Sequence, residues 1–351
     1  MSIRSHWPRH VQQADGALTT GEEVGRPADA RRCTVQLSTG RLYLDAVASP
    51  ATALFGHDRP PTPPTDEQTV KRMLSSLAPR YRCLALTRSF AAAADFAVRL
   101  GESDSPGDRR IAQINALEGE PAPGDLLVVH ENETLGRTGQ WLASSAWSRA
   151  PDLVVIGEAL ALGVPFGAVL AESHFVSRLD LAGLESVSRS RAAAPHPRGH
   201  VESTAFSDDH NRVWPECLEA ATPRALECVA AAITAVETEG LLSQGRELAT
   251  YLRERLLAVR TSCRQIESVA GTGLSLRIAF TPPLRAAEIR RKMCERGVLT
   301  GVDERARLAI DPPLAMRIAE IDVITGALRA SIVGLPPVSS SACCAACRED
   351  N

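Results

Sequence analysis

The chain has 351 residues, a formal net charge of -3 at pH 7 and 44% hydrophobic residues, values that suit a soluble globular protein of one large or two medium domains. The weak negative charge, without a basic run interleaved with aromatics, argues against a nucleic-acid-binding protein, and no stretch of 18 apolar residues predicts a membrane span. Residues 1–8 are charged and do not resemble a secretory signal, so we expect a cytoplasmic protein.

The first third of the chain predicts an arm, a hairpin and two helices. Residues 1–34 are polar and show no period, which indicates an N-terminal arm. Residues 36–48 predict a β-hairpin. Four prolines precede Thr65-Asp66-Glu67, where a helix is predicted to begin. A second helix, which is apolar and rich in alanine, is predicted to include residues 95–100. Residues 103–124 are rich in glycine, proline and charge, and predict irregular structure.

The middle of the chain predicts a sheet that is covered on both faces. Three short, continuously apolar strands are expected at residues 125–130, 153–156 and 167–171. Strands of this kind are typical of a parallel sheet. Residues 181–211 are polar and predict a loop region, and a long helical pattern follows over residues 222–259, with Pro223 in its first turn and a break at Gly240.

The C-terminal part alternates strands with helices and predicts a small α+β domain over residues 260–335. Its expected strands and helices lie at residues 275–279, 285–296, 307–310 and 318–331. Residues 336–351 form a polar tail that contains Cys343, Cys344 and Cys347. The Cys344-x-x-Cys347 pair could bind a metal or undergo redox chemistry, but no second pair or histidine lies nearby, so we expect a flexible tail and no metal site.

Residues 150–170 carry the most informative pattern of the chain. An apolar strand follows Pro151-Asp152 and ends at Gly157-Glu158, and the turn Gly163-Val164-Pro165-Phe166-Gly167-Ala168 comes next. This pattern resembles the signature of class III aminotransferases, which use pyridoxal phosphate (PLP) and have the fold-type-I architecture. In that family the strand ends at a lysine that forms the Schiff base, and Glu158 stands at this position. Only Lys71 and Lys292 occur in the whole chain.

Further motifs extend the resemblance over roughly residues 35–335. In the order of the family they are Leu42-Tyr43-Leu44-Asp45, Gly56-His57-Asp58-Arg59-Pro60, Gly136-Arg137-Thr138-Gly139, Thr222-Pro223, Gly271-Thr272-Gly273-Leu274 and Pro312-Pro313-Leu314. The resemblance implies an α/β, fold-type-I PLP-transferase-like architecture. Its large domain, residues 35–259, has a mostly parallel sheet and is shortened, and the small C-terminal α+β domain follows.

The residues that would hold PLP depart from the family pattern. In the segment that matches the phosphate loop, Phe90 replaces a glycine, which leaves Ser89 and Arg88 as phosphate-site candidates. Thr204 is a further candidate for the threonine that reaches the phosphate. The position of the acid that pairs with the pyridine nitrogen falls on Val129 or His130, and Glu131 is its neighbour.

The position of the arginine that would hold a substrate carboxylate also departs from the pattern. Ala309 or Ile310 falls there, with Arg307 close by. Together with the lost lysine, these departures predict that Schiff-base chemistry is absent. We therefore expect no bound cofactor, and PLP only if the function of the family survives.

Three functions remain open. The first is a non-catalytic homologue, a partner or regulatory subunit that forms a homodimer or a heterodimer with an intact aminotransferase. The second is a repurposed, PLP-independent enzyme that uses Glu158 and His130, with Glu131, as acid and base, and whose former cofactor cavity binds a small molecule. Residual transamination is the third. Glu158 could instead be an inert carboxylate paired with a nearby arginine.

Overall fold

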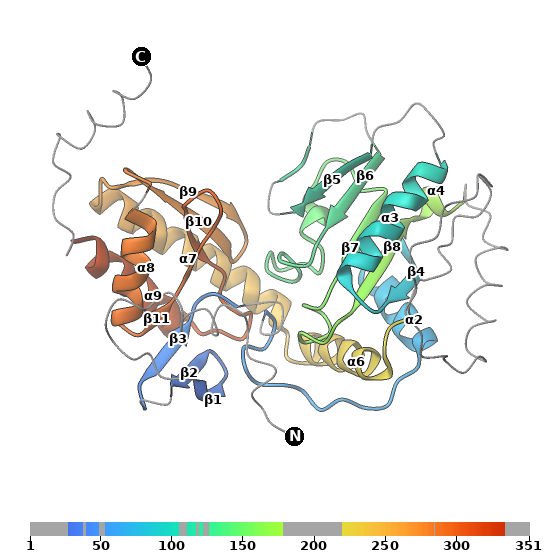
Figure 1. The fold of residues 1–351 in the computed structure, drawn as a ribbon, viewed down its shortest axis with the longest axis horizontal. Helices are drawn as coiled ribbons and strands as arrows, with labels where there is room; N and C mark the ends of the chain where they lie inside the picture. Colours follow the sequence, from blue (N-terminus) through green and yellow to red (C-terminus); the bar gives the residue numbers. More distant parts are fainter. Residues whose placement is uncertain are drawn as a thin grey trace, which may run out of the picture.

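The computed structural model describes residues 27–37, 40–48, 53–104, 111–116, 119–121, 126–177, 220–283 and 285–333. Two lobes lie side by side, and the long helix α7 (Leu241–Ser262) runs from one into the other (Figure 1). Thr204 and the cysteine-containing tail lie outside the described residues. Among the described helices, none has the length and apolarity needed to cross a membrane.

The large lobe is built on a five-stranded sheet of order β4-β8-β7-β6-β5. Its strands are β4 (Tyr81–Thr87), β5 (Ile111–Asn115), β6 (Leu126–His130), β7 (Leu153–Ile156) and β8 (Gly167–Glu172). The strands β5, β6 and β7 pair in parallel, whereas β8 is antiparallel to both β7 and β4. Every strand except β8 therefore runs in one direction, and the prediction of a mostly parallel sheet is confirmed.

Helices cover both faces of this sheet, which explains why its strands are continuously apolar. Successive side chains of a strand point to opposite faces. Thus Val155 packs with Phe96 of α3 (Phe90–Asp104), and Val154 packs in the cluster that holds Val70 and Val229. The last two residues belong to α2 (Glu67–Leu77) and α6 (Pro223–Thr238). The short helix α4 (Ser173–Val176) follows β8.

Two of the large-lobe helices begin where the sequence signals predicted. The Asp66 side chain accepts a hydrogen bond from the backbone N of Thr69 (2.7 Å) and caps α2. The Thr222 hydroxyl accepts a hydrogen bond from the backbone N of Ala225 (3.2 Å) and caps α6. Such caps satisfy backbone N–H groups that lack a partner in the first turn, so the local sequence alone was enough to locate these ends.

The prediction of irregular structure over residues 103–124 was wrong in part. Residues 111–115 form β5, an edge strand of the large sheet, which among the described strands pairs only with β6. None of its five side chains is fully buried. An edge strand of this kind lacks both the apolar run and the clean alternation that sequence patterns detect.

The small lobe contains an antiparallel sheet of order β12-β13-β10-β9. Its elements are β9 (Ile266–Thr272), β10 (Ser275–Phe280), α8 (Arg285–Glu295), β12 (Gly301–Val302), β13 (Leu308–Ile310) and α9 (Ile318–Val333). The four elements predicted between residues 275 and 331 are all present, with ends shifted by only a few residues. The strand β9, the very short β12 and the two-residue strand at residues 298–299 were not anticipated.

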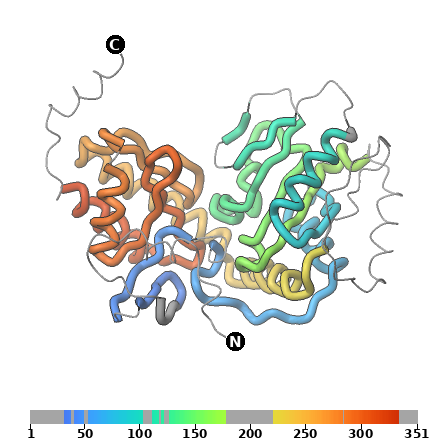
Figure 2. The backbone as a smooth tube through the Cα atoms, viewed as in Figure 1, coloured from blue at the N-terminus to red at the C-terminus, as the bar shows by residue number. Residues whose placement is uncertain are grey.

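A second sheet joins the N-terminal strands to this lobe. Its order is β1-β2-β3-β11, with β1 (Pro27–Arg31), β2 (Thr34–Leu37), β3 (Leu42–Asp45) and β11 (Val298–Leu299). The predicted hairpin is present as β2 and β3. However, β3 pairs in parallel with β11, so the hairpin lies against the small lobe and not in the large domain (Figure 2). The predicted arm also contains β1, which pairs antiparallel with the neighbouring β2 and whose sequence, Pro27-Ala28-Asp29-Ala30-Arg31, lacks the apolar pattern of a strand.

One loop holds the two lobes together, and we call residues 131–144 the interlobe loop. Its Arg137 is 2% exposed and donates to the carbonyl oxygens of Pro312 (3.0 Å) and Ala48 (3.2 Å). The carbonyl oxygen of Arg137 in turn accepts from the N of Leu274 at 2.9 Å. A Cβ on Gly136 would lie 2.9 Å from a Leu314 methyl carbon. The loop is therefore fixed against the small lobe, and the 3-10 helix η3 (Ala143–Ala146) begins at its last two residues.

Candidate functional site

The candidate site lies at the carboxyl ends of the parallel strands of the large lobe. His130 is the last residue of β6, and Glu158 lies two residues after β7. Ser89 lies between β4 and α3, and Phe90 is the first residue of α3. In open α/β sheets, ligands bind at this edge. The segments are in contact there, since a Cβ placed on Gly157 would lie 2.7 Å from a ring carbon of Phe90. The structure thus places three of the residues predicted from the sequence, Glu158, His130 and Ser89, at this edge of the sheet.

Glu158 is half-buried and sits in a tight turn, where the N of Gly163 donates to its carbonyl oxygen at 2.7 Å. The backbone of the next residue, Ala159, donates to Oδ1 of Asn132 at 3.1 Å, which ties this turn to the interlobe loop. Within the described ranges, no residue forms an ion pair or hydrogen bond with the Glu158 carboxylate. An arginine partner, expected for an inert carboxylate, is thus not found in this part of the chain.

His130 packs edge-on against the Phe90 ring, with ring centroids 5.2 Å apart and an interplanar angle of 85°. Its Nε2 is buried, and no described residue hydrogen-bonds to it. Burial lowers the pKa of His130, because the protonated ring would lose its hydration. The imidazole is therefore neutral at pH 7 and acts here as an aromatic neighbour.

Glu131 does not share this site. Its side chain is fully buried, and its carboxylate accepts hydrogen bonds from the backbone N of Ser144 (2.7 Å), the backbone N of Ala143 (3.1 Å) and the hydroxyl of Thr134. Burial also raises the pKa of Glu131, although these hydrogen bonds oppose the shift. Its side chain closes the interlobe loop instead of facing the strand-end site, which differs from the acid/base role expected from the sequence.

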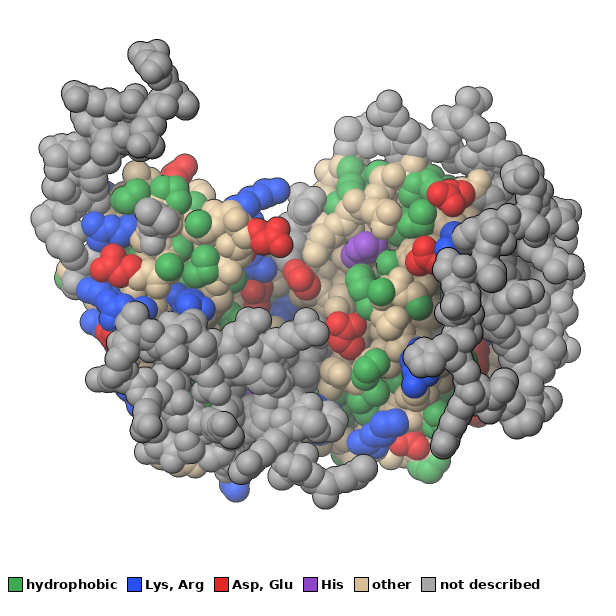
Figure 3. Space-filling model, in the orientation of Figure 1, with side chains coloured by type: hydrophobic (Ala, Val, Ile, Leu, Met, Phe, Trp, Pro, Cys, Tyr) green, Lys and Arg blue, Asp and Glu red, His purple; other side chains and the backbone are tan. Residues whose placement is uncertain are grey.

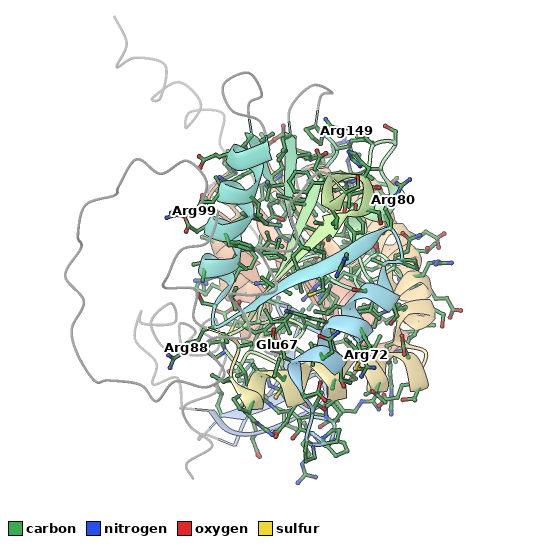
Figure 4. The ribbon with its side chains drawn as sticks, turned by 90° about the vertical axis from the view of Figure 1, so that its right-hand side faces the viewer. Glu67, Arg72, Arg80, Arg88, Arg99 and Arg149 are labelled. Atoms are coloured by element: carbon green, nitrogen blue, oxygen red, sulfur yellow. The ribbon has the colours of Figure 1, made fainter. Side chains whose placement is uncertain are left out.

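The phosphate-site candidates are engaged in local structure or point away. Oγ of Ser89 accepts from the backbone N of Ala92 at 3.2 Å and so caps α3, and the carbonyl of Ser89 accepts from the hydroxyl of Thr87 at 2.8 Å. Arg88 is exposed, and Figure 4 shows its side chain at the outside of the molecule. A Cβ on Gly167 would lie 2.3 Å from the Ser89 carbonyl oxygen, so this turn is packed tightly on β8.

These observations test whether PLP fits. The strand end offers a carboxylate at Glu158 where an amine must form an imine. Where an acid must protonate the pyridine, it offers the apolar side chain of Val129 or the neutral imidazole of His130. The ring of Phe90 fills the space beside Gly157. Lys71 lies on α2 and pairs with Glu67 at 2.8 Å, and Lys292 lies on α8 in the other lobe. The described residues therefore do not fit PLP, and we derive no reaction step through it.

Two cavities lie elsewhere. A cavity of about 920 Å³ lies between α6 and the proline-rich residues 58–63. A smaller one of about 140 Å³ lies among residues of both lobes. Figure 3 shows a hollow between the two lobes. The smaller cavity is lined by Ala48, Ala53, Asn132, Glu133, Arg137, Arg277 and Asp311. Neither cavity is lined by Glu158 or His130, and no cluster of metal-binding side chains occurs in the parts that the structure describes.

Sequence reasoning missed Asn132 and Arg277, which line the smaller cavity. Asn132 lies two residues beyond the end of β6, a position where polar side chains often face a site, so that signal was available. Arg277 had no local signal. It lines the smaller cavity because β10 pairs with β13, and this pairing places Arg277 opposite Ala309.

Comparison with known proteins gives the same architecture. The acetylornithine aminotransferase of Archaeoglobus fulgidus is 26% identical over 219 residues, which is 62% of this chain and 47% of that protein. The acetylornithine aminotransferase of Streptomyces clavuligerus is 28% identical over 214 residues, or 61% of this chain and 45% of that protein. The chain thus matches a little under half the length of these curated relatives.

Solved structures are similar over most of the chain. The ornithine δ-aminotransferase of Plasmodium falciparum superposes with a TM-score of 0.68 at 17% identity, covering 92% of this chain and 98% of that one. The acetylornithine aminotransferase of Elizabethkingia anophelis gives 0.67 at 16% identity, covering 92% and 98%. These values establish the fold-type-I architecture. Because the class III aminotransferase profile matches residues 123–332, more than half of the sequence, this chain belongs to the class III aminotransferase family.

Proposed function

We propose that this protein is a non-catalytic member of the class III aminotransferases, which acts as a partner or regulatory subunit. Other members depend on PLP. The observation that carries the proposal is the Phe90 ring, which packs against His130 and the backbone of Gly157 in the region where the phosphate loop would meet the cofactor. Glu158 at the position of the Schiff-base lysine supports it independently.

A PLP titration of the purified chain tests the loss of the cofactor. We expect no Schiff-base absorbance band, and no label after borohydride reduction. The variant Glu158→Lys restores an amine but leaves Phe90 in place, so we expect it to gain little PLP. The double variant Glu158→Lys/Phe90→Gly should gain more, since it removes both obstacles. A reduced PLP adduct on Lys71 or Lys292 of the unaltered chain would refute the proposal, and Lys71→Arg serves as the control for adventitious labelling.

The partner role is tested by assembly. Fold-type-I proteins build their sites at a dimer interface, so we propose a homodimer or a heterodimer with an intact aminotransferase. Light scattering after gel filtration gives the mass of the chain alone and mixed with an intact class III aminotransferase from the same source. A heterodimer that changes the activity of the intact enzyme supports the regulatory role. A monomer that leaves the intact enzyme unaffected contradicts it.

A second candidate function is a repurposed, PLP-independent enzyme. It is favoured by the half-buried Glu158 carboxylate, for which the described residues provide no partner, and by the neutral imidazole of His130. A neutral imidazole can accept a proton, and an unpaired carboxylate at a strand end can act as acid or base. Glu158→Gln and His130→Gln should then abolish formation of a product in cells without lowering the melting temperature. Unchanged metabolites in both variants would favour the non-catalytic role.

A further inference from the structure

The helix α9 exposes an apolar face that no described residue covers. Its other face packs on α7 and α8 through buried residues such as Ile321 and Leu328. Five large apolar side chains are exposed in the described ranges, and three of them belong to α9: Ile318, Val323 and Val333, which are 52%, 53% and 73% exposed. A surface helix of a soluble protein normally has a polar outer face, and a helix that is apolar all round is normally covered. The composition of α9 therefore indicates a second contact surface.

The exposed small and apolar residues of α9 lie on one stripe. They recur at alternating intervals of four and three residues: Ala319, Val323, Gly326, Ala330 and Val333. This is the spacing at which one helix packs along another. Gly326 is the central residue of the stripe, and a Cβ placed there would meet nothing within 4 Å. A second helix can therefore approach α9 closely at its middle.

Two charged groups flank the stripe and have bonding capacity left. Asp322 accepts a hydrogen bond from the Tyr251 hydroxyl (2.8 Å) and pairs with Nε of Arg255 (3.1 Å), but both contacts are made by its Oδ1. Its Oδ2 has no hydrogen bond or ion pair with a described residue, and the same is true of the exposed Arg329. Asp322 and Arg329 lie about two turns apart on the same side of the helix, so they do not pair with each other.

A second α9 that lies antiparallel on this stripe fits its apolar residues. When a two-fold axis passes beside Gly326, residues at equal distances on either side of Gly326 meet across the axis. Ala319 then faces Val333 of the second copy. On one flank, Val323 contacts Ala330 of the second copy, and the symmetry repeats both contacts. Each large side chain of the stripe thus meets a small one.

The same arrangement pairs the charges on the other flank. Asp322 lies four residues before Gly326 and Arg329 three residues after it, so the antiparallel copy brings the Arg329 guanidinium beside Asp322. The symmetry forms this ion pair twice. A parallel copy would instead place Asp322 against Asp322 and Arg329 against Arg329, which is repulsive. Charge complementarity therefore selects the antiparallel pair.

We propose that the exposed face of α9 binds a second copy of this chain, in an antiparallel helix pair centred on Gly326 with Asp322–Arg329 ion pairs on one flank. One pair of helices buries less than the about 1,600 Å² of a standard interface, so this self-association is weak and depends on concentration. In Figure 1 the C-terminal end of α9 lies on the side of the small lobe away from the large lobe. The surface is separate from the strand-end site, and its occupation does not depend on the proposed function.

Sedimentation velocity of the full-length chain, at concentrations up to about 0.1 mM, tests this pairing. We expect a reversible doubling of the mass. Arg329→Asp places like charges at both symmetric contacts and should weaken the association at least about tenfold. Arg264→Asp makes the same change of charge at an exposed position between α7 and β9 and should leave the association unchanged. The proposal is overturned if the mass never doubles, or if it doubles equally well in Arg329→Asp.

Mixing two variants provides the sharper test. Arg329→Asp and Asp322→Arg should each fail to pair with themselves, but a one-to-one mixture should associate, because both contacts again join opposite charges. If the C-terminal tail or another protein covers this face instead, no mixture associates and the proposal is overturned. Asp322→Arg also loses the contacts with Tyr251 and Arg255, so melting curves check its folding. Val323→Asp is the second variant, since it places a charge on the apolar flank, leaves the buried face intact and should also prevent pairing.

The test keeps this proposal apart from the proposed function. A fold-type-I dimer sets the lower mass in every variant, and pairing through α9 doubles it. Binding of Arg329→Asp to an intact class III aminotransferase then tests the partner role alone. A chain that binds the intact enzyme but never doubles its mass refutes only the α9 pair, and a chain that doubles its mass but does not bind the enzyme refutes only the heterodimer.

Discussion

The interlobe loop and the strand-end site lie next to each other but differ in what fixes their residues. In the loop, Arg137 is held by the carbonyls of Pro312 and Ala48, and Gly136 leaves no room for a side chain beside Leu314. At the strand ends, Glu158 has no partner within the described ranges, and His130 leaves a buried nitrogen without one.

This difference separates residues that are needed for packing from residues that would be needed only to bind a ligand. Residues of the loop hold two lobes together, so a substitution there destabilises the fold whether or not a cofactor binds. Under the proposed function, residues at the strand ends that would contact only PLP are no longer needed. The residues of a family signature that hold the fold can therefore stay the same while the residues that would react with the cofactor change.

The largest effect is expected for Arg137→Ala. It removes two hydrogen bonds from a charged group, leaves two buried carbonyls without donors and opens a cavity, which together should lower the free energy of unfolding by about 3–5 kcal/mol. Urea denaturation measures this change. The exposed Arg72, labelled in Figure 4, gives the control, since Arg72→Ala should stay within about 0.5 kcal/mol. A loss below about 1 kcal/mol for Arg137→Ala, close to the scale of surface substitutions, would remove the contrast between the two regions.

A smaller effect is expected for Gly167→Ala, which tests how tightly the strand-end turn is packed. The new Cβ would lie 2.3 Å from the Ser89 carbonyl oxygen, so backbone must shift, at a cost of about 1–3 kcal/mol. In Gly326→Ala, on an exposed face of α9, the Cβ meets nothing within 4 Å, and higher helix propensity should stabilise the protein by about 0.5–1 kcal/mol. Thermal unfolding should show a lower melting temperature for Gly167→Ala and a higher one for Gly326→Ala. A higher melting temperature in both variants would show that the turn tolerates a side chain.

Ser89→Ala tests the segment that resembles the phosphate loop of the family. Loss of the cap on α3 should cost about 1 kcal/mol, and Ser89→Asp should keep most of that stability because a carboxylate also caps a helix. Phosphate added during thermal unfolding should stabilise the unaltered protein no more than it stabilises Ser89→Ala. Strong phosphate stabilisation that disappears in Ser89→Ala would instead indicate a surviving anion site.

The smallest effect is a pH dependence carried by His130. Burial lowers its pKa in the folded state, so the unfolded chain binds the proton more tightly. The contribution of His130 to stability is therefore complete above its unfolded pKa of about 6.5 and is lost as the pH falls toward the lower folded value. Phe90→Ala exposes the ring and should raise the folded pKa toward that of free histidine, as followed by NMR of the imidazole protons. An unchanged pKa in Phe90→Ala would mean that Phe90 does not shield His130.

Local patterns predicted much of the fold. The strands β6, β7 and β8 are apolar because both sides of the sheet are covered, and the caps at Asp66 and Thr222 located two helix starts. The pairing of Leu44 with Val298 could not be predicted, because it joins residues that are distant in the sequence. Similarly, β5 is a half-covered edge strand whose residues carry too little pattern to distinguish it from a loop.

The site was predictable in its place but not in its contacts. The signature located Glu158, and the order of motifs located His130 and Ser89 at one edge of the sheet. The sequence did not show that Glu131 turns into its own loop, because that depends on the amides of Ala143 and Ser144, twelve and thirteen residues away. Nor did it show Arg277 beside Ala309, since strand register decides that neighbour.

The parallel pair of β3 and β11 has a consequence for the way the chain folds. Leu44 meets Val298, so one strand of this sheet emerges from the ribosome long before its partner exists. The large-lobe sheet can pair as soon as residue 172 has been made, but the N-terminal hairpin must wait for most of the chain. Contacts between such distant residues close slowly. Folding should therefore proceed from the centre of the sequence outward, with the two ends of the described chain joined last.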